Sequence, residues 1–329
     1  MFSNAFFDYE KFIVEKLRHR GAIVKFYDER PSNTTFVKAI IRVNKSFLKG
    51  KIDRYYRNIL EEIREKKYDI LFLIKGEVMP RFFIEELKRH DSDIQLFYYN
   101  YDSFFNNPNA IEILPLFDHK FTFDTYDAAK YNLKFRPLFY VDLYERKNMN
   151  NEDKVKNDVV FIGTAHSDRY KIAEEVKRQI EALGGIAYNY YYIQGKLIYW
   201  YKKVFDKSFS DFEYRKLSFN KLNHRDVVGL YNNSKCVLDI NHPHQTGLTM
   251  RTFEALGAGK KLITTNPEVK KYSFYNPQNI LVIDRKRVEI DKEFLNGAVC
   301  EISREDLYTM SLDGWIDDIF LARKAKYLG

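Results

Sequence analysis

The sequence has little cysteine and no long apolar run. Cys236 and Cys300 are the only cysteines among 329 residues, and Cys236 stands inside the apolar segment "CVLDI". Two cysteines do not form a disulfide framework, so we expect buried thiols in a reducing compartment. No apolar stretch reaches the ~20 residues needed to cross a bilayer, and no signal peptide precedes Phe2. Both features predict a cytoplasmic protein.

Several sequence signatures are also missing. A Gly-x-Gly-x-x-Gly fingerprint and a Walker motif are both absent, which weakens the case for a dinucleotide-dependent oxidoreductase and for a P-loop enzyme. The chain has no internal repeat of solenoid period and no low-complexity tract. These absences favour an ordinary globular protein.

Aromatic residues and positive charge are abundant. The chain has 25 Tyr and 27 Phe, an aromatic content of 16%, and a formal net charge of +8. We expect most rings to fill cores, although exposed rings can stack on sugars or bases. The charge indicates either a solvated lysine-rich surface or a match to an anionic ligand or anionic membrane face. Basic residues are spread over both halves, which argues against a nucleic-acid partner.

The alternation of apolar and amphipathic segments in the first half predicts parallel strands joined by helices. The strand patterns lie at 22–27, 69–74, 95–99 and 120–123, and the helical patterns at 9–20, 52–66, 81–90 and 125–132. A helix begins almost at once, so either residues 1–7 hold a short first strand or that strand is missing.

A segment without aliphatic pairs, residues 144–157, separates the halves. Strand patterns return at 158–163, 187–190, 236–240, 261–265 and 280–284, with helical patterns at 168–183, 225–233 and 248–257. The chain therefore has the pattern of an α/β protein with two doubly wound, Rossmann-like domains, 1–145 and 156–310. In the terminal segment 311–329, an amphipathic helix over 311–324 is expected to cross back to the first domain.

Ligands of open parallel sheets bind beyond the carboxyl ends of the strands, which selects three loops of the second domain. They are residues 163–171, 241–247 and 265–276. The first, "GTAHSDRYK", offers Gly163, Thr164 and Arg169, whose backbone N–H groups, hydroxyl and cation suit a diphosphate. The alternative is a plain strand-to-helix turn with surface charges.

The segment "GLTMRTFEALGAGKKLITTN" (247–266) carries polar residues inside an apolar helical pattern. A helix starting near Thr246 would place Gly247, Arg251 and Glu254 on one face. Its N-terminus and Gly247 would accept an anion, Arg251 would bind phosphate oxygens, and Glu254 would accept hydrogen bonds from hydroxyls. The alternative is a local Arg251–Glu254 ion pair.

Two further features have open interpretations. His242 and His244 flank Pro243 without a nearby carboxylate or third histidine, so we favour phosphate or sugar contacts over a metal site, against ordinary loop residues. Residues 188–207 mix tyrosines and Trp200 with lysines. Such a segment suits a lipid headgroup interface, or it packs on its own domain or on a dimer partner.

The segment 247–266, preceded by "YNNSKCVLDI" and "DVVFIGTAHSDRYK", resembles the donor half of GT-B glycosyltransferases. The resemblance is strongest to CgeB-like and bacterial capsule or lipopolysaccharide biosynthesis members. "FFDYEKFIVEKLRHRGAIVKFYDERP" resembles the start of that family's first domain. The resemblance implies two domains facing a cleft and a nucleotide-sugar-dependent hexosyltransferase.

The resemblance also implies partners and site residues. The donor is a nucleotide-sugar, with a UDP-sugar favoured, and the acceptor is a glycan or lipid-linked molecule. The aromatic and basic residues of 188–207 separately indicate peripheral contact with a membrane. No cofactor and no metal are expected, in agreement with the absence of an Asp-x-Asp motif. Glu254 matches the acidic residue that holds the ribose hydroxyls. The full set expected to bind the donor is Gly163, Thr164, Arg169, His244, Thr246, Gly247, Arg251 and Glu254.

The stereochemical course is less strongly indicated. Thr246 stands where many retaining members carry the first of two glutamates, which favours inversion. An inverting enzyme needs a base from the first domain, and Asp102 and Glu77 rank first because each follows a strongly apolar strand. Asp8, Asp28 and Glu29 remain alternatives, and an aspartate here can instead cap a helix or fix a turn.

A rival interpretation belongs to another class of protein. The positive charge and the aromatic residues would also suit a non-catalytic module that binds polysaccharide or nucleic acid. Such a module would ignore nucleotide-sugars and bind less tightly as salt increases.

Overall fold

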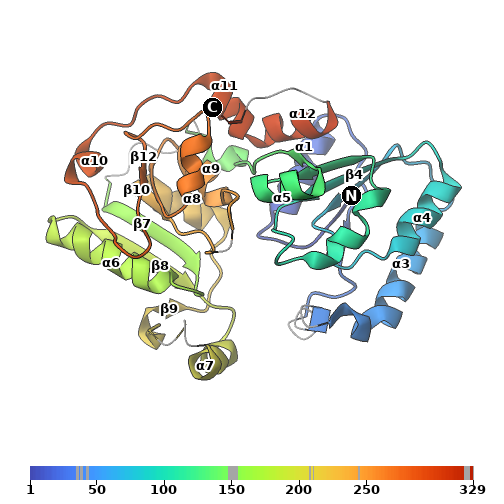
Figure 1. Cartoon of the computed structure of the whole chain (residues 1–329), viewed down its shortest axis with the longest axis horizontal. Helices are drawn as coiled ribbons and strands as arrows, with labels where there is room; N and C mark the ends of the chain where they lie inside the picture. Colours follow the sequence, from blue (N-terminus) through green and yellow to red (C-terminus); the bar gives the residue numbers. More distant parts are fainter. Residues whose placement is uncertain are drawn as a thin grey trace. The chain divides into compact units, whose positions relative to one another are not determined.

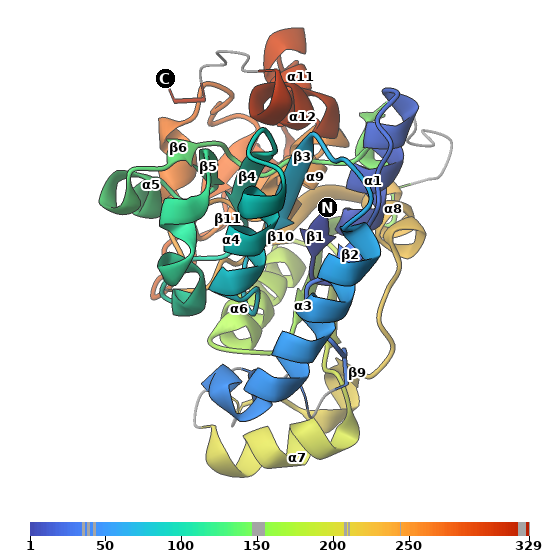
Figure 2. The same cartoon turned by 90° about the vertical axis from the view of Figure 1, so that its right-hand side faces the viewer.

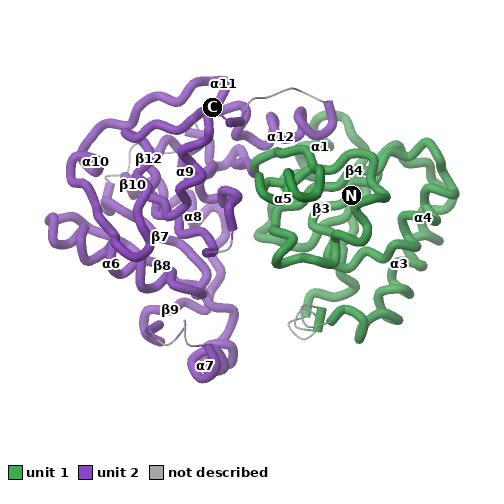
Figure 3. Tube along the Cα trace, viewed as in Figure 1, with its two compact units in different colours: residues 1–137 green, residues 138–329 purple. Residues whose placement is uncertain are grey.

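The computed structural model describes residues 1–34, 37, 40, 41, 44–146, 155–206, 209, 211–243, 245–321, 327 and 328. They fold into two compact units, Met1–Pro137 and Leu138–Gly329 (Figure 3). Each unit contains a six-stranded sheet with helices around it (Figure 1). The fold class of two doubly wound α/β domains is therefore confirmed. Among the described helices, none is long and apolar enough to cross a bilayer.

The sheet of unit 1 is entirely parallel. Its strand order is β2 (Tyr27–Asp28), β1 (Phe2–Ser3), β3 (Ile70–Ile74), β4 (Gln95–Asn100), β5 (His119–Thr122) and β6 (Lys134–Phe135). Residues 1–7 do hold a short first strand, which pairs Phe2 with both Tyr27 and Leu73. The connections leave in opposite directions from β1 and β3, so these two strands form the switch point of unit 1.

The prediction of a strand over residues 22–27 is wrong for all of them except Tyr27. Only Tyr27 belongs to β2, and Ile23 is fully exposed. The physical reason is the length of its neighbour. The edge strand β2 can pair only where β1 offers backbone partners, and that register consists of Phe2 with Tyr27 and Ser3 with Asp28.

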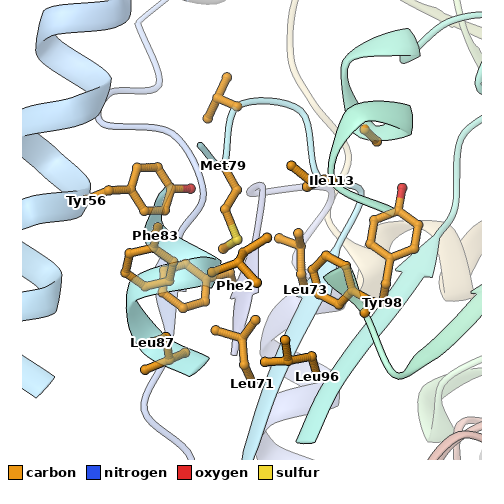
Figure 4. Packing of buried hydrophobic residues seen from close by; sticks show 14 of the residues in the cluster. Phe2, Tyr56, Leu71, Leu73, Met79, Phe83, Leu87, Leu96, Tyr98 and Ile113 are labelled. Carbon is orange, nitrogen blue, oxygen red and sulfur yellow. The ribbon is translucent and has the colours of Figure 1, made fainter. Parts of the chain in front are cut away.

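Four α-helices accompany this sheet among the described residues, and their apolar stripes explain why they form. They are α1 (Tyr9–His19), α3 (Lys49–Ile63), α4 (Arg81–His90) and α5 (Thr125–Tyr131). On α3, Ile52, Tyr56, Ile59 and Ile63 recur at helical spacing and are buried. Figure 4 shows Tyr56 near Phe2 and Phe83, in the layer between sheet and helices.

The sheet of unit 2 is also parallel. Its order is β12 (Ile280–Val282), β11 (Lys261–Thr264), β10 (Ser234–Asp239), β7 (Asn157–Thr164), β8 (Ala187–Tyr192) and β9 (Leu217–Ser218). The central pair is β7 and β10, with Val159 opposite Cys236. The order reverses between these strands, so their carboxyl ends form the switch point where sheets of this type bind ligands.

The described helices of unit 2 are α6 (Arg169–Ala182), α7 (Lys196–Phe205), α8 (His224–Asn232), α9 (Met250–Gly257), α10 (Lys292–Asn296), α11 (Arg304–Met310) and α12 (Leu312–Phe320). Three of them, α7, α10 and α11, lie outside the helical patterns of the sequence. Helix α7 lies within the aromatic segment 188–207 and stands apart from the sheet in both views (Figures 1 and 2). Helix α12 falls within the predicted segment 311–324.

Helix α9 begins later than the sequence predicts. It starts at Met250 instead of near Thr246, and Thr249 precedes it with an extended backbone. The side chain of Asn266 donates hydrogen bonds to the carbonyls of Thr246 (3.0 Å) and Gly247 (3.4 Å). These bonds hold the segment before Met250 in a loop, so Gly247 does not share a helical face with Arg251 and Glu254.

The last two helices are bound to the start of unit 2. Tyr140 donates its N–H to the Met310 carbonyl at 2.9 Å and accepts from the Leu312 N–H at the same distance. Trp315 of α12 is fully buried, with its ring 4.8 Å from that of Phe139. A return of the terminal segment to the first unit stays a prediction.

Candidate functional site

The switch point of unit 2 gathers charged residues from three strand ends. Arg169 is the first residue of α6, just after β7. Its Nε donates to the carbonyl oxygen of Ile240, just after β10, at 2.9 Å. A guanidinium thus bridges the two loops that flank the switch point.

The position of Arg169 concentrates positive charge. Burial first, together with the cations of Arg251 and Arg285, lowers its pKa to about 10, while Asp239 and Asp168 oppose this shift. The guanidinium groups of Arg169, Arg251 and Arg285 therefore lie close enough to influence one another. Such an environment favours binding of an anion.

Arg285 connects a third loop to the same place. It follows β12, and its Nη1 lies 2.8 Å from both carboxylate oxygens of Asp168. Its Nη2 donates to the side-chain oxygen of Asn241 at 2.6 Å. Sequence reasoning missed Arg285, although the strand-end rule applied to "ILVID" would have selected it.

Asp239 ties α9 to the switch point. It is the last residue of β10 and is buried. Its Oδ2 accepts hydrogen bonds from the hydroxyls of Thr249 (2.8 Å) and Thr252 (2.9 Å). Its buried Oδ1 has no hydrogen-bond partner within the part of the chain that the structure describes. Sequence reasoning also missed Asp239, and the signal was a carboxylate inside the apolar run "CVLDI".

Glu254 is held by tyrosines from two other elements. Its side chain is buried, and Oε2 accepts a hydrogen bond from the Tyr231 hydroxyl of α8 at 3.4 Å. Burial raises the pKa of Tyr231 and of Tyr144, and the charge of Glu254 raises both further. The Tyr144 hydroxyl also lies 2.8 Å from Nδ1 of His224. This network orients the Glu254 carboxylate.

Four other residues predicted to bind the donor lie at the strand ends and loops around this switch point, namely Gly163, Thr164, Thr246 and Gly247. Gly163 and Thr164 end β7, and the Thr164 carbonyl accepts from Arg169 Nη1 at 3.5 Å. An added Cβ on Gly163 would lie 2.5 Å from the ring of Phe161, so glycine is needed there. Thr246 is exposed and Gly247 is buried. His244 lies outside the described residues.

His166 is a neutral polar group in the same loop. Its Nδ1 lies 3.1 Å from the Ser167 hydroxyl, and its ring centroid is 5.8 Å from that of His242. Burial lowers the pKa of His166 to about 3, and the cation of Arg169 contributes. A neutral imidazole can both donate and accept hydrogen bonds. Among the described residues, no three His, Cys, Asp or Glu side chains are grouped as metal ligands.

In unit 1, Glu77 lies at the switch point between β1 and β3. Its Oε2 accepts from Arg30 Nε at 2.6 Å and from the Asn4 side chain at 3.4 Å. Lys75 Nζ lies 3.6 Å from the other carboxylate oxygen. Glu77 is therefore buried and paired with two cations.

Asp102 follows β4 and is more accessible than Glu77. Its side chain is 27% exposed, and Oδ2 lies 3.3 Å from Lys75 Nζ. Its Oδ1 accepts from the Ser103 N–H at 2.9 Å and the Asn106 side chain at 3.1 Å. Asp102 therefore fixes a turn, as its alternative interpretation has it, while one oxygen faces a lysine.

Glu29 differs from the other carboxylates of unit 1. It is fully buried, and Oε1 accepts from the backbone N–H groups of Val78 (2.6 Å) and Met79 (3.2 Å). Burial raises its pKa to about 7, against the opposing effect of those hydrogen bonds. The remaining alternatives are local turn residues, since Asp28 accepts from the Arg30 N–H at 2.8 Å and Asp8 pairs with Lys11 at 2.8 Å.

Residues 171–296 match the model of a protein family described as glycosyl transferase-like. The matched span contains Arg251, Glu254 and Arg285, while Arg169 lies just before it. It covers less than half of the chain. We found no curated protein with a significant match.

Solved structures of low sequence identity share the fold. An alpha-glucosyltransferase, solved with UDP and a 13-mer DNA containing an A:G mismatch, is 11% identical with a TM-score of 0.54. That match covers 87% of this chain and 86% of the other. A glycosyltransferase from Rickettsia africae ESF-5 is 12% identical with a TM-score of 0.51, covering 97% and 93%. The two-domain architecture of GT-B glycosyltransferases is thus confirmed for this chain, and the CgeB-like assignment stays a prediction.

Proposed function

We propose that this protein is a glycosyltransferase that binds a nucleotide-sugar, preferably a UDP-sugar, at the switch point of unit 2. The observation that carries the proposal is the half-buried guanidinium of Arg169, which joins both switch-point loops and whose pKa is lowered by burial and by Arg251 and Arg285. A diphosphate would give these neighbouring guanidinium groups an anionic partner. The match of residues 171–296 to a glycosyl transferase-like family supports the same function.

Three groups have separate roles in donor binding. Arg169 and Arg251 contact the diphosphate, because guanidinium groups bind phosphate oxygens through paired hydrogen bonds. Glu254 accepts hydrogen bonds from the ribose hydroxyls, with Tyr231 keeping its carboxylate in place. The cations stabilise the leaving diphosphate, so the reaction needs no resident metal.

The acceptor is a glycan or lipid-linked molecule of bacterial surface polysaccharide synthesis, and transfer inverts the anomeric centre. Unit 1 supplies the base that takes the acceptor proton. Asp102 is favoured over Glu77, because Asp102 is 27% exposed whereas Glu77 is buried against Arg30. Thr246 in place of a glutamate supports inversion.

Calorimetric titration with UDP and with uridine tests the proposal. Arg169→Lys keeps the charge but loses the planar fork, so UDP affinity should fall about tenfold or more, the scale of a charge-assisted hydrogen bond. Uridine affinity should change little. Arg178→Lys is the matched control, because Arg178 is exposed on the same helix and pairs only locally with Glu175.

The contrary results are equally clear. If the wild-type protein binds neither UDP nor any other nucleoside diphosphate, the proposed donor site is wrong. Salt-sensitive binding to polysaccharide or nucleic acid by such a protein would favour the non-catalytic module. Equal losses for UDP and uridine in Arg169→Lys would remove Arg169 from phosphate recognition.

A further inference from the structure

Helix α7 presents an apolar face to solvent. Its large apolar side chains recur at the i, i+3, i+4, i+7 and i+8 spacing of a single helical face. The exposed fractions along this face are 86% for Leu197, 59% for Trp200, 66% for Tyr201, 71% for Val204 and 72% for Phe205. Contiguous apolar faces of this kind mark interaction sites.

The opposite face of α7 fixes this orientation. Tyr199 is buried, with its ring 5.1 Å from that of Tyr214 and 5.8 Å from that of Phe209. Lys202 Nζ donates to the Ala165 carbonyl at 3.3 Å and lies over the Phe209 ring. Turning the apolar face inward would break these contacts, so the helix is built to present that face outward.

Basic residues outnumber acidic ones on and beside helix α7, although Lys202 and Lys203 donate to carbonyls of their own unit. Helix α7 contains Lys196, Lys202 and Lys203, and Asp206 follows its last residue. Lys196 is exposed at its start. The exposed Arg215 follows Tyr214, whose ring stacks on Trp200 with centroids 6.4 Å apart. An exposed apolar stripe with tryptophan and tyrosine, on a helix whose own charged residues are all basic, is the composition of a helix that lies in an anionic lipid interface.

We propose that the apolar face of α7 (Leu197, Trp200, Tyr201, Val204 and Phe205) binds an anionic membrane surface, with the helix axis in the plane of the headgroups. The proposal is independent of the donor site, since α7 contributes none of the residues proposed to bind the nucleotide.

Tryptophan fluorescence during vesicle titration provides the first test. The chain has two tryptophans, and Trp315 is fully buried, so a spectral change on adding vesicles reports on Trp200. Equimolar phosphatidylglycerol and phosphatidylcholine vesicles should shift the emission to the blue and pellet the protein. Pure phosphatidylcholine vesicles should bind it about tenfold or more weakly, because the cations then have no anionic partner.

Co-sedimentation of a double variant provides the second test. Trp200→Ser with Phe205→Ser should lower the vesicle partition coefficient about tenfold or more. Phe47→Ser is the matched control, since Phe47 is 76% exposed but lies outside α7, and it should bind vesicles as the wild type does. UDP affinity should be unchanged in the double variant, which separates failure of this proposal from failure of the donor site.

Three outcomes would overturn the proposal. The first is equal vesicle binding by the double variant and the wild type, and the second is equal binding to anionic and neutral vesicles. The third is a wild-type dimer, seen by light scattering, that becomes monomeric in the double variant without any vesicle binding by the wild type. That result would make the face a contact between copies of this chain.

Discussion

At the scale of single residues, burial decides what each carboxylate of this protein can do. Asp102 keeps one oxygen near Lys75 and remains partly exposed, whereas Glu77 is enclosed by Arg30, Asn4 and Lys75. Glu29 accepts hydrogen bonds from two backbone N–H groups, and burial raises its pKa to about 7. Carboxylates from neighbouring loops of unit 1 therefore lie in different electrostatic environments.

Replacing Glu254 tests whether its carboxylate binds the ribose hydroxyls. Glu254→Ala should weaken UDP binding by roughly 1–3 kcal/mol, the scale of a hydrogen bond to a charged group. It should also abolish most of the preference for UDP over 2′-deoxy-UDP, because that preference depends on an acceptor for the missing hydroxyl. Calorimetry with both nucleotides measures the two effects, and an unchanged preference would assign Glu254 to the tyrosine network alone.

Replacing Glu29 tests its raised pKa. The pKa of Glu29 is about 7 in the folded protein and ordinarily 4.5, so protonated Glu29 favours the folded state. This contribution to the free energy of unfolding is fully present below pH 4.5 and is lost as pH rises through about 7. Glu29→Gln cannot ionise, and its stability relative to the wild type should therefore increase by roughly 3 kcal/mol over that interval, at 1.36 kcal/mol per pH unit. Urea unfolding across pH measures this difference, and parallel curves would show that Glu29 ionises normally.

At the scale of elements, helix boundaries follow side-chain bonds from distant segments more than local periodicity. Asn266, which follows β11, binds the carbonyls of Thr246 and Gly247, and Asp239 of β10 binds Thr249 and Thr252. Together they set the start of α9 at Met250. The position of Arg251 in the first turn of α9 depends on that start.

The junction of α11 and α12 allows a test of close packing. An added Cβ at Gly314 would collide with the Tyr308 carbonyl oxygen, a backbone atom that cannot move alone. Gly314→Ala should therefore reduce the free energy of unfolding by about 1–3 kcal/mol. Gly50→Ala in α3 is the matched control, because nothing lies within 4 Å of its added Cβ. That control should gain about 0.5–1 kcal/mol from helix propensity, and equal effects in urea unfolding would contradict the packing argument.

At the scale of the whole molecule, each unit has its own switch point, and the proposed reaction assigns a different task to each. In unit 2, Arg169 and Arg285 link the loops at the switch point. In unit 1, Lys75 contacts Asp102 and Arg30 contacts Glu77. Binding of the donor and removal of the acceptor proton should therefore respond to different substitutions.

Turnover measurements test this division. Asp102→Asn should leave UDP affinity unchanged and lower transfer by the 10²–10⁴-fold typical of a lost general base. Glu77→Gln should disturb the pairing with Arg30 and affect transfer less. If both variants keep near-full transfer, the base is Asp8, Asp28 or Glu29, or the reaction retains configuration. NMR of the anomeric centre in the product distinguishes inversion from retention.

The sequence by itself determined the features that depend on local periodicity. These include the succession of most strands and helices along the chain, the fold class, and the spacing that brings Arg251 and Glu254 onto one helical face. Hydrophobic alternation depends on neighbouring residues, so the sequence carries it directly. It failed where the neighbours are distant, as in residues 22–26, which lack a partner strand.

Only the tertiary structure decided which groups meet. Arg169 and Ile240 are separated by 71 residues, and Arg285 and Asp168 by 117, and they meet because β7, β10 and β12 lie in one parallel sheet. The order of the strands within the sheet decides these contacts, and local sequence patterns carry no information on that order. The same reason applies to the raised pKa of Glu29 and to the outward face of α7, since burial depends on the packing of residues far apart in the chain.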